Sequence, residues 1–193
     1  MMDGMKWSVW CEGGDLRALK VTLSMGLTLA IMVLIFCFSA QSGGESGSLS
    51  DTIARMLATA FVGGFDNMPI KQQTQIIAQM SWPIRKTAHA SEYACLAISL
   101  VITCWQLHAW RCDKKAAMSS LGRRVTLVGV VAFIIAVLYA CSDEVHQLFI
   151  DGRAGQVADV LVDASGAAIG CLLMCLAMCV FLKRHIAKRE STR

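Results

Sequence analysis

Uninterrupted apolar stretches constrain the fold of this chain more than any other feature of its sequence. Residues 21–40, 125–141 and 164–182 have the length that a helix needs to cross a bilayer, roughly 20 residues. Residues 88–107 also qualify if their polar first turn lies at the membrane interface. The composition agrees, because 55% of the 193 residues are hydrophobic and only 17% are charged, whereas a soluble domain is nearer a quarter charged. The sequence therefore predicts an all-α polytopic membrane protein, a bundle of four transmembrane helices.

The basic residues predict how this bundle is oriented. Lys and Arg concentrate on the cytoplasmic side of membrane proteins, and 13 of the 18 Lys and Arg residues lie in the two terminal segments and in the connection between the second and third spans. Both termini are therefore predicted to be cytoplasmic, in a multi-pass protein of the cell (inner or cytoplasmic) membrane. The formal charge of +4 is explained by this distribution, so the bilayer is the expected partner and no nucleic acid is.

The expected organisation is one transmembrane domain with short ends. Residues 1–18 are predicted to be a cytoplasmic lead-in, residues 19–185 the transmembrane domain, and residues 186–193 a basic cytoplasmic tail. Seven of the nine cysteines fall in the apolar spans and none in an extracytoplasmic loop, so we expect no disulfide framework. In the fourth helix, Gly166 and Gly170 have the spacing that allows another helix to approach closely.

An amphipathic segment is expected on the extracytoplasmic side, between the first two transmembrane helices. It is expected to be a helix that lies in the membrane interface or against the outer ends of the bundle. Residues 71–79 are expected to form a second short surface helix. Ser81 is then predicted to cap the second transmembrane helix, with Pro83 in its first turn. The apolar positions of the amphipathic segment recur at helical spacing: Leu49, Ile53, Met56, Leu57, Ala60 and Phe61.

Polar side chains gather where each predicted span meets the outer side of the membrane. Ionisable residues are costly next to hydrocarbon, so by default they mark a functional site. Since all four predicted helices carry polar side chains at their outer ends, at the same depth in the membrane, we expect these side chains to form a shared site. The candidates are Gln41 and Ser42 at the end of the first helix, Arg85, Lys86, His89, Glu92 and Tyr93 in the second, Asp143, Glu144 and Gln147 at the end of the third, Arg153 in the next connection, and Asp159 and Asp163 in the fourth.

Structural explanations compete with function at several of these positions. Asp159 favours the positive end of its helix, which is worth about 0.3–1 kcal/mol, and Arg85 and Lys86 suit snorkelling to the interface. Glu144 and Asp163 lie deeper and need a partner, for which Arg153, Arg85 and Lys86 are the available cations. An ion-pair lattice that only joins the helices is therefore the main alternative to a binding or catalytic site.

The order of these segments resembles that of the VanZ family of small membrane proteins, over roughly residues 30–182. The matching segments are Gln41-Ser42, RKTAHASEY from residue 85, and DEVHQLFIDGRAGQVADVLVDASGAAIG from residue 143. One position departs from the family pattern, because Asp163 stands where the family usually has Asn. The positions that match the family motifs are Gln41, Lys86, His89, Tyr93, Asp143, Glu144, Gln147, Arg153, Asp159 and Gly166.

The resemblance implies a setting at the outer face of the membrane. The named member of the family is linked to resistance to teicoplanin, a lipoglycopeptide that binds lipid-linked cell-wall precursors outside the membrane. The first functional hypothesis is therefore a non-enzymatic protein that binds an envelope lipid or a lipoglycopeptide and affects antibiotic susceptibility. Arg85, Lys86 and Arg153 would pair with phosphate or carboxylate groups. The other expected ligand-binding residues are Gln41, Glu92, Tyr93, Gln147, Asp159 and Asp163.

The second hypothesis is a membrane-embedded hydrolase or transferase that acts on a lipid-linked phosphate or ester. Asp143 or Glu144 would be the general base and His89 the general acid. A divalent metal is a variant of this mechanism, but no compact metal-binding motif supports it, so no metal or other cofactor is expected. A proton-coupled transporter is a third and weaker hypothesis. An open cleft lined by these side chains would favour catalysis, whereas locked ion pairs would favour a binding or structural role.

Overall fold

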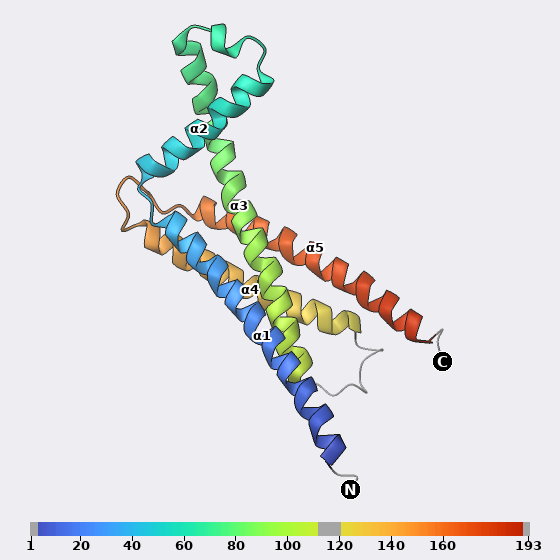
Figure 1. Cartoon of the computed structure of the whole chain (residues 1–193). Coiled ribbons are helices and arrows are strands. Elements are labelled where there is room, and N and C mark those ends of the chain that lie inside the picture. The colour runs from blue at the N-terminus through green and yellow to red at the C-terminus, as the bar shows by residue number, and fades with distance from the viewer. Residues whose placement is uncertain (1–3, 112–120, 191–193) are drawn as a thin grey trace.

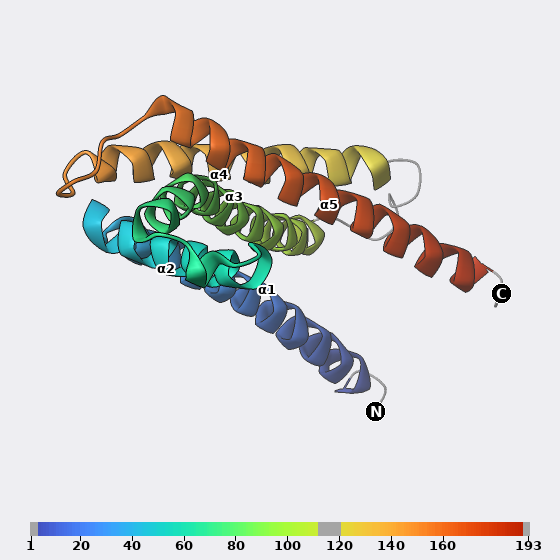
Figure 2. The same ribbon diagram turned by 90° about the horizontal axis from the view of Figure 1, so that it is seen from above.

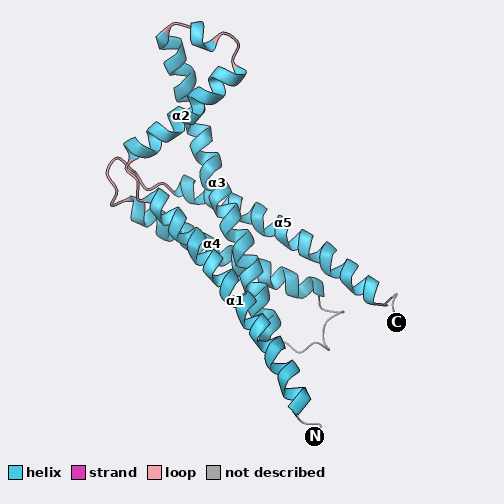
Figure 3. Cartoon of the chain, viewed as in Figure 1, coloured by secondary structure: helices cyan, strands magenta, loops and turns pink. Residues whose placement is uncertain are grey.

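The computed structural model describes residues 4–111 and 121–190, in which all regular structure is helical (Figures 1 and 3). Four helices have stretches long and apolar enough to cross a membrane, and they contain the four predicted spans. The predicted all-α membrane bundle is therefore confirmed. In chain order the elements are α1 (Gly4–Ser39), α2 (Gly43–Phe61), the 3-10 helix η1 (Phe65–Asn67), α3 (Ile70–Arg111), α4 (Leu121–Gln147) and α5 (Val157–Glu190).

Helix α3 is the centre of the bundle. It packs against α1, α2, α4 and α5, and in the view from above it lies between α1 and the α4–α5 pair (Figure 2). Both termini lie away from the end that carries α2 (Figure 1). The core is made largely of small side chains, which let the helix backbones approach closely. Its fully buried members are Tyr93, Leu96, Ala97 and Val101 of α3, Ala132, Ala136 and Ala140 of α4, and Ala167 of α5.

The closest helix contact joins α3 and α5. A Cβ atom added at Gly166 would overlap the backbone of Ala90, and one added at Gly170 would overlap the backbone of Ala94. The predicted small-residue face of the fourth helix therefore exists and packs on α3. This contact fixes the depth and rotation of the first turns of α5, where Asp159 and Asp163 lie.

Helix α2 and the first part of α3 form a hairpin outside the main bundle (Figure 1). The small residues Ser50, Ala54 and Ala58 of α2 are its buried positions, and Ala54 and Ala58 pack with Phe65 and Ile77. The large apolar side chains that predicted an amphipathic helix point away from the protein. Leu49, Ile53, Met56 and Phe61 are all exposed. Contact with the outer ends of the bundle is therefore excluded for these side chains, whereas a position in the membrane interface agrees with their exposure.

The prediction that Ser81 begins the second transmembrane helix is wrong. Helix α3 runs without interruption from Ile70 to Arg111, with Pro83 in its interior. The expected short helix over residues 71–79 is the first part of the same helix. Ser81 Oγ lies 2.8 Å from the Ile77 carbonyl oxygen and 2.5 Å from Asp51 Oδ1, so its hydroxyl group joins α3 to α2 instead of capping a helix.

The end of α4 and the start of α1 set the lengths of these two helices. Helix α4 ends at Gln147, and a turn follows in which Gly152 has a φ of 71°. The expected lead-in is helical from Gly4, so α1 is longer than the span that it contains.

Candidate polar site

The predicted polar helix ends meet at the α2 end of the bundle. They come from the α1–α2 connection, the last residues of α4, the first turns of α5, the middle of α3 and the α4–α5 connection (Figure 1). We call the side chains of Arg85, Lys86, His89, Glu92, Tyr93, Asp143, Glu144, Gln147, Arg153, Asp159 and Asp163 the polar cluster.

Two chain connections are joined beside the polar cluster. The Gly43 amide donates to the Asp151 carbonyl oxygen at 3.0 Å. A Cβ atom at Gly43 would overlap the carbonyl of Gly152, so the α1–α2 connection lies directly against the α4–α5 connection. Arg153 completes this contact, because its guanidinium group donates to the main-chain oxygens of Phe38 and Gln41 at 3.3 and 3.2 Å. Gln41 therefore contributes its main-chain oxygen to this contact, and its expected role in ligand binding stays a prediction.

Lys86 and Asp159 form an ion pair between α3 and α5. The two side chains are only 19% and 24% exposed, and the Lys86 ammonium group also lies 5.8 Å from the centre of the exposed Trp82 ring. The sequence had suggested Lys86 as a partner for the deeper Glu144 or Asp163. It pairs instead with Asp159, which lies one turn nearer the start of α5.

A histidine and a carboxylate face each other one turn deeper. His89 Nδ1 lies 3.9 Å from Asp163 Oδ1. Asp163 is 2% exposed, and its Oδ1 atom makes no hydrogen bond. The hydroxyl group of Tyr93 is also buried without a hydrogen-bond partner. Asp163 therefore has a histidine as its neighbour, not one of the three predicted cations.

The two adjacent carboxylates of α4 have different environments. Glu144 Oε1 accepts a hydrogen bond of 2.5 Å from the Gln156 amide, which places a negative charge at the start of α5, where the helix dipole favours it. Asp143 Oδ2 accepts from Gln147 Nε2 at 3.4 Å, but Asp143 Oδ1 is buried and unbonded. Ser39 of α1 is a buried neighbour of Asp143 that was not among the candidates from the sequence.

Two arginines lie near each other on the α1–α2 side of the cluster. An Arg85 guanidinium nitrogen lies 3.7 Å from the place a Cβ atom of Gly47 would take, and Arg85 Nε is buried without a hydrogen bond. Burial lowers the pKa of Arg153, and the positive charge of nearby Arg85 lowers that pKa further. Within residues 4–111 and 121–190, neither guanidinium group has a carboxylate within 4.0 Å.

The remaining candidates complete the arrangement. Glu92 is partly buried near Asp143, and Gln147 Oε1 accepts from Arg153 Nη1 at 3.4 Å. His146 of α4 stacks on Phe36 with a centroid distance of 4.6 Å. The described parts of the chain contain no group of three His, Cys, Asp or Glu side chains arranged to hold a metal ion. The catalytic assignment of His89, Asp143 and Glu144 stays a prediction.

The groups of the polar cluster differ in whether they already have a hydrogen-bond or ion-pair partner, and those without one can bind a ligand. Lys86, Asp159 and Glu144 are engaged in an ion pair and a helix-terminal hydrogen bond. Arg85, Asp143, Asp163 and Tyr93 each keep a buried polar atom without a partner, and leaving such an atom unpaired costs about 1–3 kcal/mol. The cluster is therefore partly an ion-pair lattice and partly a set of groups able to bond a ligand.

The family model described as VanZ/LLP1 matches residues 25–180. Neither the curated proteins nor the solved structures include a match to this chain.

Proposed function

Because this chain belongs to the VanZ/LLP1 family, we propose that its polar cluster binds the anionic head of an envelope amphiphile. The amphiphile is a lipid or a lipoglycopeptide, and its binding changes the susceptibility of the cell to teicoplanin-type antibiotics. That the chain is a membrane protein of this family follows from the family match and from the four apolar helices.

The observation that carries the proposal is the pair of arginines without carboxylate partners. Arg153 is anchored by neutral oxygens of Phe38, Gln41 and Gln147, and Arg85 keeps an unbonded Nε atom beside it. Two neighbouring guanidinium groups repel each other, and an anion between them relieves that repulsion. Guanidinium groups also bind phosphate or carboxylate through paired N–H donors.

Apolar surface next to the cluster suits the rest of an amphiphile. The Trp82 side chain is 67% exposed and lies against Lys86. Tryptophan is favoured at the membrane interface, where its apolar ring meets acyl chains and its N–H group meets water. The bias of basic residues toward the termini supports an outward-facing cluster, the side on which teicoplanin acts.

Antibiotic susceptibility tests the proposal. A sensitive host would express the wild type, Arg85→Gln, Glu144→Gln or the control Arg55→Gln, whose charge lies on the exposed surface of α2. We expect the wild type and Arg55→Gln to raise teicoplanin tolerance selectively over vancomycin tolerance, and Arg85→Gln to abolish this rise at equal membrane levels. Since Gln can still accept the hydrogen bond from the Gln156 amide, loss in Glu144→Gln would show that the negative charge of Glu144 is also required.

Two outcomes would overturn parts of the proposal. Tolerance that survives Arg85→Gln would show that the arginine pair is not the binding site. An unchanged susceptibility in cells with correctly inserted wild type would show that the family fold alone does not confer teicoplanin tolerance.

A second candidate function is hydrolysis or transfer on a lipid-linked phosphate or ester. The His89–Asp163 pair favours it, because a carboxylate that orients a histidine is a frequent arrangement in acid-base catalysis. Phosphate release from polyprenyl diphosphate in detergent, by the wild type and by His89→Gln, tests this function. Turnover that disappears in His89→Gln supports catalysis, and equal background rates in both proteins reject it for this substrate.

A further inference from the structure

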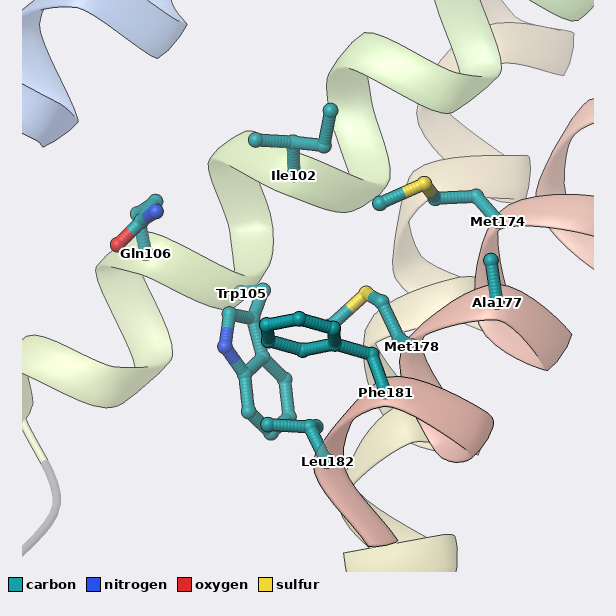
Figure 4. Close-up of a pocket in the computed structure, with 8 residues that line it drawn as sticks. All are labelled: Ile102, Trp105, Gln106, Met174, Ala177, Met178, Phe181 and Leu182. Carbon is teal, nitrogen blue, oxygen red and sulfur yellow. The ribbon is translucent and has the colours of Figure 1, made fainter. Parts of the chain in front are cut away.

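An apolar groove lies between α3 and α5 (Figure 4). Its lining residues, at positions 102–106 of α3 and 174–182 of α5, belong to the parts of these helices that lie beyond the polar cluster. It encloses about 300 Å³, within the usual size range of small-molecule sites. Trp105 of α3 faces Met178, Phe181 and Leu182 of α5 across it (Figure 4). Gln106 is the one amide side chain of its lining.

The groove follows from the way in which the two helices pack. Gly166 and Gly170 bring α5 against the backbone of α3 near the polar cluster. Beyond them α5 continues with larger residues and diverges from α3 toward the C-terminus (Figure 1). The α5 residues that line the groove, at positions 174, 177, 178, 181 and 182, form one helical stripe. This stripe spans roughly 12 Å at 1.5 Å per residue, so the groove is elongated along the helix, as an acyl chain would be.

Exposed positive charges lie at the same end of the bundle. Lys183 and Arg184 directly follow the last lining residue of α5, and Arg123 lies in the first turn of α4. Residues 96–111, 121–142 and 164–189 contain no Asp or Glu, so acidic side chains of these segments do not offset the charge. Basic pockets between transmembrane helices are typical sites for the head groups of anionic lipids.

We propose that this groove binds an acyl chain of an anionic phospholipid, whose phosphate group contacts Arg184. At about 100° per residue Arg184 flanks the lining stripe, whereas Lys183 lies on the opposite face of α5. The apolar lining accounts for the chain, and Arg184 accounts for the head group. This site is separate from the polar cluster, so the two proposals succeed or fail independently.

Quenching of Trp105 fluorescence by brominated lipids tests the proposal. The full chain, with Trp7, Trp10, Trp82 and Trp110 changed to Phe, would be reconstituted in phosphatidylcholine vesicles. Phosphatidylglycerol or phosphatidylcholine with brominated acyl chains would then be added at increasing mole fraction. We expect the anionic lipid to quench Trp105 at a lower mole fraction than the neutral lipid.

Variants separate the two parts of the site. Ala177→Phe fills the groove and is expected to abolish the preferential quenching, whereas Ala168→Phe, the same change on an exposed position of α5 outside the groove, leaves it unchanged. Arg184→Gln is expected to weaken the preference about fivefold, from ~1 kcal/mol per basic residue near the lipid head groups. Lys183→Gln, on the opposite face of α5, is the neighbouring control and should weaken the preference less. The control Lys71→Gln, at the α2 end, should have no effect.

Two results would overturn the proposal. Equal quenching by both lipids would mean that the groove meets bulk lipid without selecting its charge. Absence of quenching by either lipid would mean that another occupant, such as a second copy of the chain, covers Trp105.

Discussion

The ion pair between Lys86 and Asp159 joins α3 to α5 where both side chains are mostly buried. Removing one partner leaves the other charge without a counter-charge near hydrocarbon. We therefore expect Lys86→Gln and Asp159→Asn each to lower the free energy of unfolding by about 1–3 kcal/mol. The double variant should lose less than the sum of the two.

Thermal unfolding in detergent of the wild type, both single variants and the double variant measures this coupling. Lys71→Gln, which removes an exposed positive charge from the first turn of α3, is the matched control. Strictly additive losses would show that the pair contributes no interaction energy.

Every residue of the polar cluster was a candidate from the sequence, but the sequence did not predict how these residues pair. Which cation meets which carboxylate depends on the rotation of α5 against α3, and that rotation is set by backbone contacts at Gly166. Ser39 and the main-chain oxygens that accept from Arg153 could not be predicted, because buried serines are common in helices and every residue carries a carbonyl group.

At the scale of elements, the α3–α5 contact depends on residues without side chains. Gly166→Ala would place a methyl group into the backbone of Ala90, so the helices must separate. We expect a loss of about 1–3 kcal/mol in stability, as for other overpacked sites. Gly26→Ala in α1 is the control, since no atom lies within 4 Å of its added Cβ. That change should leave stability equal or higher, because alanine favours helix more than glycine does. Thermal unfolding in detergent measures the stability of both variants. An equal change of stability in Gly166→Ala and Gly26→Ala would contradict the close contact between α3 and α5.

The start of α2 is expected to depend on pH. Ser42 and Glu45 form a reciprocal capping box, and the amide and hydroxyl donors of Ser42 lower the pKa of Glu45 below its ordinary value of 4.5. A lowered carboxylate pKa means that the stabilisation is complete above the ordinary value and is lost as pH falls through the lowered one. Amide exchange over residues 43–47, corrected for intrinsic rates, should therefore accelerate between pH 6 and pH 3.

The variant Glu45→Gln provides the matched control for this experiment, because Gln can accept the same hydrogen bond but does not titrate. Its corrected exchange should be independent of pH over the same interval. An equal pH response in both proteins would assign the effect to another group.

The elements show where local sequence signals were overridden by tertiary contacts. Ser81 and Pro83 look like a helix start, yet α3 continues through them. The preceding turns are stabilised by α2 and by Gln73, whose amide donates to the Met68 oxygen at 3.0 Å. Likewise α2 has both a small-residue face and a large apolar face, and only packing decides that the small one meets α3. The spans themselves were predictable, because hydropathy measures a requirement of the bilayer that packing does not change.

At the scale of the whole molecule, four crossings place both termini on one side and the α2 hairpin on the other. The distribution of Lys and Arg predicts that the termini are cytoplasmic. In a chain without its native cysteines, Asp66→Cys in η1 should react with a membrane-impermeant maleimide added to intact cells. Ser191→Cys should react only after the membrane is opened. The reverse pattern would invert the topology and place the polar cluster toward the cytoplasm.

The central position of α3 has a consequence for how the protein is made. Synthesis delivers α1 and α2 first, and α3 is the second span to enter the membrane, before α4 and α5 exist. Since α3 packs on all four of these helices, the early ones can dock on it at once, and the later ones find a formed surface when they leave the ribosome. The Thr28–Thr103 hydrogen bond between α1 and α3 belongs to the early stage, whereas the polar cluster is completed only by the last span. A nascent chain thus acquires its scaffold before it acquires its site.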